Sequence, residues 1–453
     1  MQFVAASPTN PIFCRRSGSG YRGTRRLLIV PPANCWKCAI ATHLHQRSVF
    51  RRGSASRLLL AGLSAFAFQF PAGALELNVP GEPIQVHGFV SQGFIKTNAN
   101  NYLAESTRGS FEFTEVGLNF SKELTDRLRV GVQLFARRLG PLDGFDANFD
   151  WFYLDYRWAD WLGIRAGRVK LPFGLYNEIN DIDSARVPIL LPQSIYPTAN
   201  RDFLLAQTGG EIYGRVSLAS AGALEYRAYG GTLFLRSTTP PNSPYQIGKL
   251  NAPYVVGGRI LWETPLEGLR VGGSLQALRL DADFFFNPSI FGPLQAAGTL
   301  PPDFTGKVGV QIPAILWVGS AEYSSGALLL AAEYSRWYVQ ATSTQSVLFP
   351  NISTMVSERF YGMLAYRVNP WLHPGLYYSG YYTDVENRSG RANMQHDAAA
   401  TLRFDINEYW LLKLEGHFMY GTAALDPTLN HDRPLTDLQK TWGVLLVKTT
   451  AHF

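Results

Sequence analysis

Ionic side chains recur at alternate positions within apolar segments of this chain. In residues 128–137, one parity carries Arg129, Gln133 and Arg137, and the other carries Leu128, Val130, Val132, Leu134 and Ala136. Because alternate residues of a β-strand face opposite sides of a sheet, such a strand has one charged face and one apolar face. Charges arranged along a wall that faces water set a local field, which selects solutes by the sign of their charge.

The strongest candidates for such a field lie on two predicted strands and in the long segment 170–203. They are Arg129, Arg137, Arg168 and Lys170 on the strands, and Glu178, Asp181, Asp183 and Arg186 in the segment. The segment is rich in charge and proline, and its apolar residues 189–191 need a surface to pack on. We therefore expect it to fold inward and to form a constriction with the wall residues. The alternative for each residue is a salt bridge that only braces the wall.

The sequence favours neither catalysis nor metal binding. Cys14, Cys35 and Cys38 all lie in the first 48 residues, so residues 75–453 contain no thiol nucleophile or thiolate ligand. The six histidines after residue 74 include no pair at i, i+2 or i, i+4, and His396-Asp397 belongs to no spaced motif. We therefore predict that the protein is not an enzyme and has no cofactor and no metal. An outer-membrane hydrolase is the catalytic alternative.

The positive net charge of the chain comes from its first 74 residues. They hold ten of the 41 basic residues and no acidic residue, so 31 basic and 35 acidic residues remain in 75–453, a net charge of −4. A nucleic-acid partner is therefore not expected. Arginines before the apolar run 58–70, and small residues ending at Ala74, predict a secretory signal peptide over 49–74. Residues 1–48 do not fit this signal, and we interpret them as a gene-model extension or an unstructured leader.

Period-two segments fill the rest of the chain. Sixteen are found, at residues 84–95, 110–121, 128–138, 149–158, 161–169, 204–217, 223–232, 254–262, 269–279, 315–323, 327–338, 357–367, 372–382, 396–405, 408–420 and 441–453. Most have the length that a tilted strand needs to cross a bilayer, and short links alternate with long ones. Residues 75–453 are therefore predicted to be all-β: a transmembrane antiparallel β-barrel of about sixteen strands, with short periplasmic turns and long extracellular loops.

The last strand carries a possible assembly signal. Counting back in twos from the terminal Phe453 gives the apolar parity, whereas Lys448, Thr450 and His452 lie on the other. This strand resembles the C-terminal strand of bacterial outer-membrane barrels, which the barrel assembly machinery recognises. The resemblance implies that this machinery is a partner and that Phe453 is the residue it reads.

Three segments resemble a porin family that includes the phosphate-selective porins O and P and the trimeric dicarboxylate-type porins. They are Ala166–Gly174, His87–Phe89 and the strand Phe111–Phe120. The resemblance implies a homotrimer embedded in outer-membrane lipid, through which small hydrophilic solutes diffuse passively with a preference for anions. The dense ladder of arginine and lysine that phosphate selectivity requires is not seen. The alternative is a structural or receptor-type barrel whose extracellular loops bind a partner.

Overall fold

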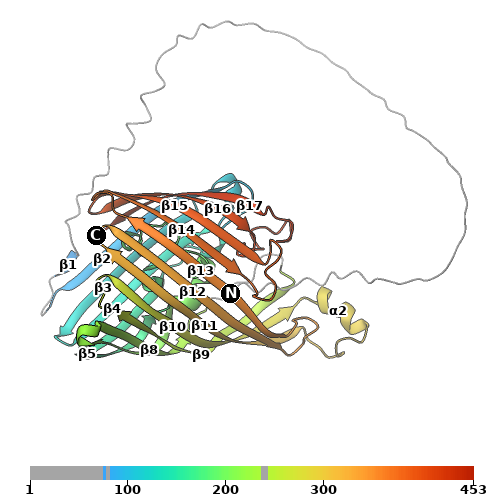
Figure 1. Ribbon diagram of the computed structural model, residues 1–453. Coiled ribbons are helices and arrows are strands. Elements are labelled where there is room, and N and C mark those ends of the chain that lie inside the picture. Colours follow the sequence, from blue (N-terminus) through green and yellow to red (C-terminus); the bar gives the residue numbers. More distant parts are fainter. Residues whose placement is uncertain (1–74, 78–81, 236–242) are drawn as a thin grey trace, which may run out of the picture. The chain divides into compact units, whose positions relative to one another are not determined.

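Sixteen antiparallel strands form a closed barrel (Figure 1). The structure, a computed structural model, describes residues 75–77, 82–235 and 243–453. The predicted extension 1–48 and signal peptide 49–74 lie outside the described residues. The barrel strands are β2 (Ile84–Thr97), β3 (Phe113–Thr125), β4 (Leu128–Leu139), β5 (Asn148–Ala159), β6 (Leu162–Lys170), β7 (Ala206–Ser217), β8 (Ala223–Leu233), β9 (Tyr245–Glu263), β10 (Leu269–Phe286), β11 (Lys307–Ser325), β12 (Leu328–Ser343), β13 (Ile352–Tyr366), β14 (Leu372–Tyr382), β15 (Met394–Asn407), β16 (Trp410–Gly421) and β17 (Thr441–His452).

The barrel closes because its last strand pairs with its first. Each strand from β2 to β17 pairs with the next one in sequence, and β17 pairs back onto β2 with Ala451 opposite Val90. The short strand β1 (Leu75–Leu77) pairs with the beginning of β2. The prediction of a sixteen-stranded antiparallel barrel is therefore confirmed. Short turns such as 126–127 and 160–161 alternate with longer loops such as 98–112 and 171–205, as expected.

The remaining elements are short helices in the links. The α-helices are α1 (Arg201–Leu204) and α2 (Pro288–Ala296), and the 3-10 helices are η1 (Ser106–Arg108), η2 (Gly140–Leu142), η3 (Asn177–Ile179), η4 (Asp183–Ala185), η5 (Thr198–Asn200) and η6 (Ala219–Ala221). Among the described residues, no helix is both long and apolar enough to cross a membrane.

Side chains alternate between the interior of the barrel, here called the lumen, and its outer face. On β4, Gln133 is 2% exposed and the next residue, Leu134, is 37% exposed. On β16, Lys413 and Glu415 are buried inside, whereas Leu414 is exposed outside. The apolar outer face and the ionic inner face are those of a transmembrane barrel, and the predicted parities of these strands are confirmed.

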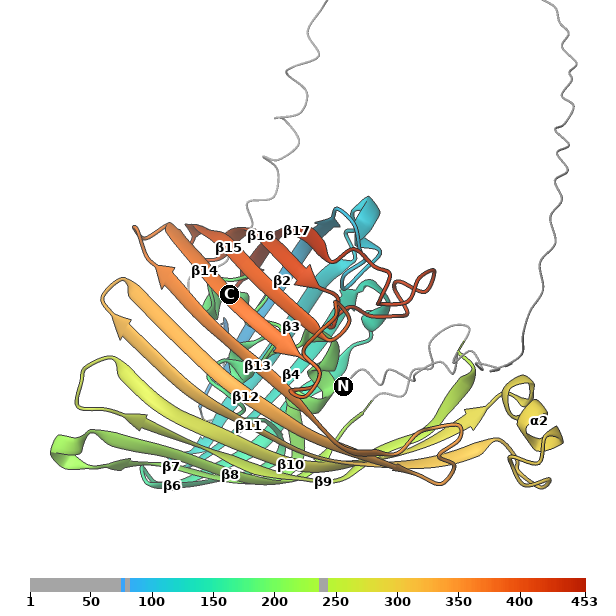
Figure 2. The ribbon, with the colours of Figure 1, turned by 45° about the vertical axis from the view of Figure 1, so that its right-hand side comes forward.

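Four neighbouring strands are longer than the sequence pattern predicts. β9, β10, β11 and β12 have 19, 18, 19 and 16 residues, against 9 to 15 in the other barrel strands. They extend beyond the rest of the barrel at the long-loop end, and α2 lies beyond this extension in the β10–β11 link (Figure 2). Asp281, Asp283, Gly309 and Pro313 lie in the extension, and these residue types usually indicate a loop. Ladder pairing between β10 and β11 overrides this local preference, since their register is continuous from Leu269 to Phe285.

Candidate functional site

The link between β6 and β7, residues 171–205, crosses the lumen and is called the inner loop here. Its backbone bonds to three strands of the opposite wall. Leu175 N donates to Glu333 Oε1 on β12 at 2.9 Å, and Arg359 on β13 donates to the carbonyl oxygen of Ser194 at 3.0 Å. Ile189 N donates to Glu415 Oε2 on β16 at 2.6 Å. The loop therefore divides the interior of the barrel.

On one side, the inner loop packs against an apolar wall made by the inner faces of β8–β13. Leu171, Phe173 and Ile195 of the loop are fully buried in one cluster with wall residues such as Ile312 and Val339. The rings of Phe173 and Trp337 meet edge to face with centroids 6.4 Å apart. This packed contact with β8–β13 is called the apolar side.

A glycine lets the loop approach this wall closely. Gly174 has a φ of +64°, a conformation that disfavours other residues, and its N–H donates to Ser274 Oγ at 2.8 Å. A Cβ at this position would lie 2.5 Å from the hydroxyl oxygen of Tyr196 and 2.8 Å from Glu333. The Tyr196 hydroxyl donates to Glu333, so these two side chains together enclose the turn at Gly174.

On the other side, ion pairs attach the inner loop to β16, β17 and β3. Asp183, which is buried, lies 2.6 Å from Lys448 Nζ and 3.0 Å from Arg186, and it accepts a hydrogen bond from Thr450 at 2.9 Å. Lys413 Nζ, also buried, donates to the carbonyl oxygens of Asp183 and Arg186 at 2.8 Å. Together with the β2–β5 wall, this region is called the ionic side.

These cations hold Asp183 in its charged form. Burial alone would raise the pKa of Asp183, but Lys448, Arg186 and Lys413 more than offset it, so the pKa lies well below its usual range. The carboxylate therefore stays ionised where an ordinary aspartate would take up a proton. Since a buried charge needs such partners, the cluster fixes the position of the loop at Asp183.

A second cluster joins the root of the loop to β4 and β5. Asp181 accepts hydrogen bonds from Lys170 at 2.9 Å and from Gln133 at 3.1 Å, and Arg201 lies 3.7 Å away. Arg201 also pairs with Asp150 at 2.7 Å. Burial would raise the pKa of Asp181, but Lys170 and Arg201 lower it well below its usual range.

Glu178 connects the inner loop to strands β8 and β9. It pairs with Arg227 on β8 at 2.6 Å and with Arg259 on β9 at 3.3 Å. Burial raises the pKa of Glu178, but Arg227 and Arg259 outweigh burial and leave the pKa lowered. Glu178 is therefore a brace between the loop and the wall.

Two hollows are lined by residues of the ionic side. A cavity of about 400 Å³ at the short-turn end, called the vestibule, is lined by residues that include His87, Gln133, Asp183, Thr450, His452 and Phe453. Further in, a hollow of about 20 Å³ is called the narrow hollow, and its polar lining is Glu115, Arg137, Asn180, Asp181, Arg186, Thr198 and Arg201. The narrow hollow has room for about one water molecule, and an adjoining hollow of about 10 Å³ shares Asn180, Asp181 and Arg201 with it.

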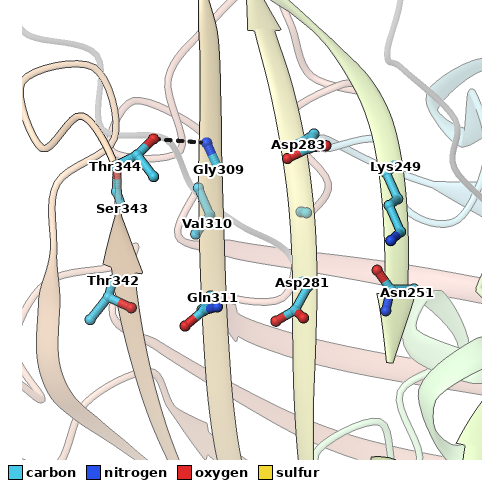
Figure 3. Close-up of a pocket in the computed structure, with 11 residues that line it drawn as sticks. Lys249, Asn251, Asp281, Asp283, Gly309, Val310, Gln311, Thr342, Ser343 and Thr344 are labelled. Carbon is cyan, nitrogen blue, oxygen red and sulfur yellow. Dashed lines mark hydrogen bonds between the residues drawn. The ribbon is translucent and has the colours of Figure 1, made fainter. Parts of the chain in front are cut away.

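A larger hollow, of about 430 Å³, does not belong to the lumen. It is lined by residues of the extended strands β9–β12 and of the link after β12, among them Lys249, Asp281 and Gln311 (Figure 3). Asp281 and Gln311 alternate with Ala282 and Val310, which are buried on the lumen side. The hollow therefore lies on the outer face of the extension and takes no part in a passage through the barrel.

The structure brings six of the eight candidate residues to the inner loop and its contacts. Lys170, Glu178, Asp181, Asp183 and Arg186 form the clusters described above. Arg137 lines the narrow hollow and pairs with Asp143 at 2.5 Å.

Arg129 and Arg168 lie elsewhere. Arg129 faces the lumen near the short turn after β3 and donates to Ser121 at 3.0 Å. Arg168 is paired in register with Phe152 and is buried, and the φ of +129° at Gly167 beside it interrupts the regular alternation of β6. Its Nε donates to the Asp150 carbonyl oxygen at 2.9 Å, and its guanidinium lies 4.7 Å from the centre of the Phe234 ring.

Several lumen arginines were not among the candidates, among them Arg165 and Arg201. Arg165 takes the inward position on β6 and pairs with Asp155 at 2.9 Å and with Glu211 at 3.1 Å. Its parity, shared with Gly163 and opposite to Ile164, was visible in the sequence. Arg201 lies in the four-residue helix α1 of the inner loop. The sequence of this link has no period of two residues from which the direction of the Arg201 side chain could be predicted.

In the described part of the chain, no group of three or more His, Cys, Asp or Glu side chains could hold a metal ion.

The C-terminal residue pairs with β2, the first strand of the barrel. Phe453 N donates to the Gly88 carbonyl oxygen at 3.0 Å, and Gly88 N donates to the Phe453 carbonyl oxygen at 3.1 Å.

Comparison with known proteins supports the fold. No family model matches the sequence, and none of the curated proteins matches it either. Among solved structures, the outer-membrane expressed OmpT of Vibrio cholerae is similar, with 8% identity and a TM-score of 0.52 over 84% of this chain and 100% of that chain. OmpF of Salmonella typhi in complex with daunomycin has 14% identity and a TM-score of 0.49 over 84% of this chain and 100% of that chain. The anion-selective porin from Comamonas acidovorans has 10% identity and a TM-score of 0.47 over 82% of this chain and 100% of that chain.

The sixteen paired strands, their apolar outer face and the similarity to OmpT agree. The chain has a sixteen-stranded transmembrane β-barrel fold like that of OmpT, an outer-membrane protein.

Proposed function

We propose that the chain forms a water-filled channel in the outer membrane for passive diffusion of small hydrophilic solutes. The observation that carries this proposal is the inner loop, which crosses a barrel with an ionic lumen and leaves the vestibule and the narrow hollow on one side of it. A purely structural barrel has no need of a loop held across its interior by buried ion pairs. The constriction is formed by Arg137 of the wall and by Asp181 and Arg186 of the loop.

The charge of the narrow hollow supports a modest preference for anions. Arg137, Arg186 and Arg201 face it with three guanidinium groups, against the carboxylates of Glu115 and Asp181. Each of these arginines is also paired with an aspartate, Asp143, Asp183 or Asp150, so the proposed preference rests on the guanidinium groups that line the hollow and not on a net positive charge of the region. Phosphate selectivity, which needs a denser ladder of cations, is not proposed.

Bilayer recordings test the channel directly. Refolded protein in a planar bilayer is expected to give discrete conductance steps, with a reversal potential in a salt gradient that favours anions. Arg137→Gln removes a charge from the narrow hollow and should shift the reversal potential toward cations. Arg129→Gln is the matched control, since Arg129 lies at the short-turn end away from the inner loop, and it should leave the reversal potential nearly unchanged. Absence of conductance steps would rule out the channel.

Assembly is part of the proposal. We propose that the chain is inserted by the barrel assembly machinery through Phe453 and that it forms a homotrimer in outer-membrane lipid. The mutual hydrogen bonds between Phe453 and Gly88 support a role for the last residue in closing the barrel. Deletion of Phe453 should reduce the folded fraction in cells, and chemical crosslinking of the membrane-embedded protein should yield a trimer band.

A receptor-type function is the second candidate, and the extension of β9–β12 favours it. The β10–β11 link at the end of this extension contains α2, none of whose residues is buried. Deleting residues 287–306 would abolish binding of an extracellular partner without changing conductance if the extension is a receptor. Unchanged binding of that partner after the deletion would remove this candidate.

A further inference from the structure

Three basic side chains lie among tyrosines on the outer face of the barrel, near the long-loop ends of β12–β17. Arg336 belongs to β12, Arg388 to the loop between β14 and β15, and Lys440 directly precedes β17. Arg336 shares the outward parity of Tyr334 and is paired in register with Glu358. These side chains therefore continue the lipid-facing surface rather than the lumen.

Each of the three cations contacts an aromatic ring. Arg336 Nε donates to the Tyr334 hydroxyl oxygen at 2.8 Å. The guanidinium of Arg388 lies 5.2 Å from the centre of the Tyr382 ring, and Lys440 Nζ lies 4.2 Å from the centre of the Tyr420 ring. Such contacts orient a cation beside a ring without neutralising its charge.

A histidine joins the Arg388–Tyr382 and Lys440–Tyr420 pairs, and Glu358 links Arg336 to Arg388. The Tyr378 hydroxyl and His396 Nδ1 are 2.8 Å apart, and the His396 ring lies 5.4 Å from the Tyr382 ring and 6.4 Å from the Tyr420 ring. We call this surface the aromatic–basic belt. Exposed apolar residues such as Leu376 and Leu414 lie on the same face toward the short turns. The belt therefore occupies the level at which amphipathic rings meet lipid headgroups.

Among the described residues, a single carboxylate forms direct ion pairs with cations of the belt, while Asp384 and Glu386 lie in the same β14–β15 link as Arg388. Glu358 is this carboxylate, at 2.8 Å from Arg388 and 3.5 Å from Arg336. The outward arginine of β4 differs, because Arg138 is matched by one carboxylate, Glu112, at 2.5 Å. Three cations against one contacting carboxylate complement an anionic partner on the lipid side.

We propose that the aromatic–basic belt binds the phosphate groups of anionic lipid headgroups in the outer leaflet. Arginine and lysine supply charge-assisted hydrogen bonds to phosphate oxygens, and the tyrosine rings hold these cations at the headgroup level. The ligand is a lipid because the belt lies on the membrane-facing surface, where a headgroup reaches it together with its acyl chains. This inference goes beyond the channel and does not depend on solute flux.

Native mass spectrometry of the full-length barrel in detergent tests the proposal. The probe is lipid A with two phosphates, compared with its dephosphorylated form. The combined variant Arg336→Gln, Arg388→Gln and Lys440→Gln should bind the phosphorylated lipid at least about tenfold more weakly, because each cation near a lipid surface contributes roughly fivefold. Arg138→Gln is the matched control and should bind it like the unchanged protein. Charge-retaining Arg336→Lys and Arg388→Lys should keep most of the binding.

Several outcomes would overturn the proposal. Equal binding by the combined variant and the unchanged protein would show that the belt is not the site. Equal binding of phosphorylated and dephosphorylated lipid would exclude phosphate recognition. Displacement of the lipid by inorganic phosphate alone would assign the belt to a free anion. A loss of oligomers with unchanged lipid binding would assign this face to contact between copies of the chain.

Discussion

The two sides of the lumen hold the same loop by different physical means. On the apolar side, Phe173 and its neighbours pack against β8–β13 in a single buried cluster. On the ionic side, Asp183 meets Lys448 and Arg186, and Glu415 accepts hydrogen bonds from the backbone of Ile189 and Leu190. The side chains of Ile189 and Leu190 also pack in a smaller apolar cluster there.

The difference explains where hollows remain beside the loop. Apolar side chains interdigitate without regard to direction, so the loop fills the space along β8–β13. Ion pairs and hydrogen bonds fix particular atoms, and the polar side chains between these points leave hollows that water can enter. The vestibule and the narrow hollow are both on the ionic side. Weakening one side of the loop at a time should therefore affect stability and conductance differently.

Removing a ring from the apolar side should have the largest effect. Phe173→Ala should lower the free energy of unfolding by about 3–5 kcal/mol, because the ring is fully buried and leaves a cavity beside Trp337. Urea unfolding of the barrel in lipid vesicles measures this. Phe418→Ala, at an outward ring that is 61% exposed, is the control and should cost much less. Equal losses for the two variants would contradict a packed apolar side.

Breaking the ionic attachment should come next. Asp183→Asn should cost about 3 kcal/mol, because buried Lys448 and Lys413 lose the carboxylate that compensates them, although Glu115 still pairs with Lys448. Single-channel conductance should rise as the loop separates from β16 and β17. Asp303→Asn, in the exposed β10–β11 link, should change stability by less than about 0.5 kcal/mol. An unchanged conductance for Asp183→Asn would mean that the apolar side alone positions the loop.

Substituting Gly174, where the inner loop approaches the apolar side closely, should have a smaller effect on stability. Gly174→Ala should cost more than the roughly 1–2 kcal/mol of left-handed backbone strain, because the added Cβ also meets Tyr196 and Glu333. Gly326→Ala isolates the strain, since Gly326 has a φ of +58° and nothing lies within 4 Å of its Cβ position. If both variants lose the same free energy of unfolding, the close approach at Gly174 is unimportant.

Mild acid should have the smallest effect. The pKa values of Asp181 and Asp183 are lowered, so their contribution to stability is complete above the ordinary aspartate pKa of 3.8. It is lost only as the pH falls through the lowered values. Conductance should therefore stay constant between about pH 6 and pH 4. Asp150, the partner of Arg201, is a further buried carboxylate beside this attachment, so the recording is repeated with Asp150→Asn to separate that group from Asp181 and Asp183. A rise in conductance within this window would show that these carboxylates take up protons earlier and that the ionic attachment is weaker than proposed.

Some strand ends and one side-chain direction escaped the sequence pattern. The extension of β9–β12 was missed because Asp281, Asp283 and Pro313 have loop-like preferences, while hydrogen bonding to neighbouring strands decides where a ladder ends. Arg168 was placed on the inward parity of its strand, but Gly167, with a φ of +129°, interrupts the alternation of β6 next to it. A period of two residues therefore does not fix the direction of a side chain that follows such a residue.

The sequence by itself determined the sixteen strands, their two faces and the link that enters the lumen. These features follow from a period of two residues, from the opposition of apolar and ionic parities and from loop length, all of which are local. Only the tertiary structure decided which loop residue meets which wall residue. Ile189 and Glu415 are 226 residues apart, and no local pattern encodes that contact. It exists because closing the barrel brings β16 to the inner loop, and a buried carboxylate then requires the nearest available N–H donors.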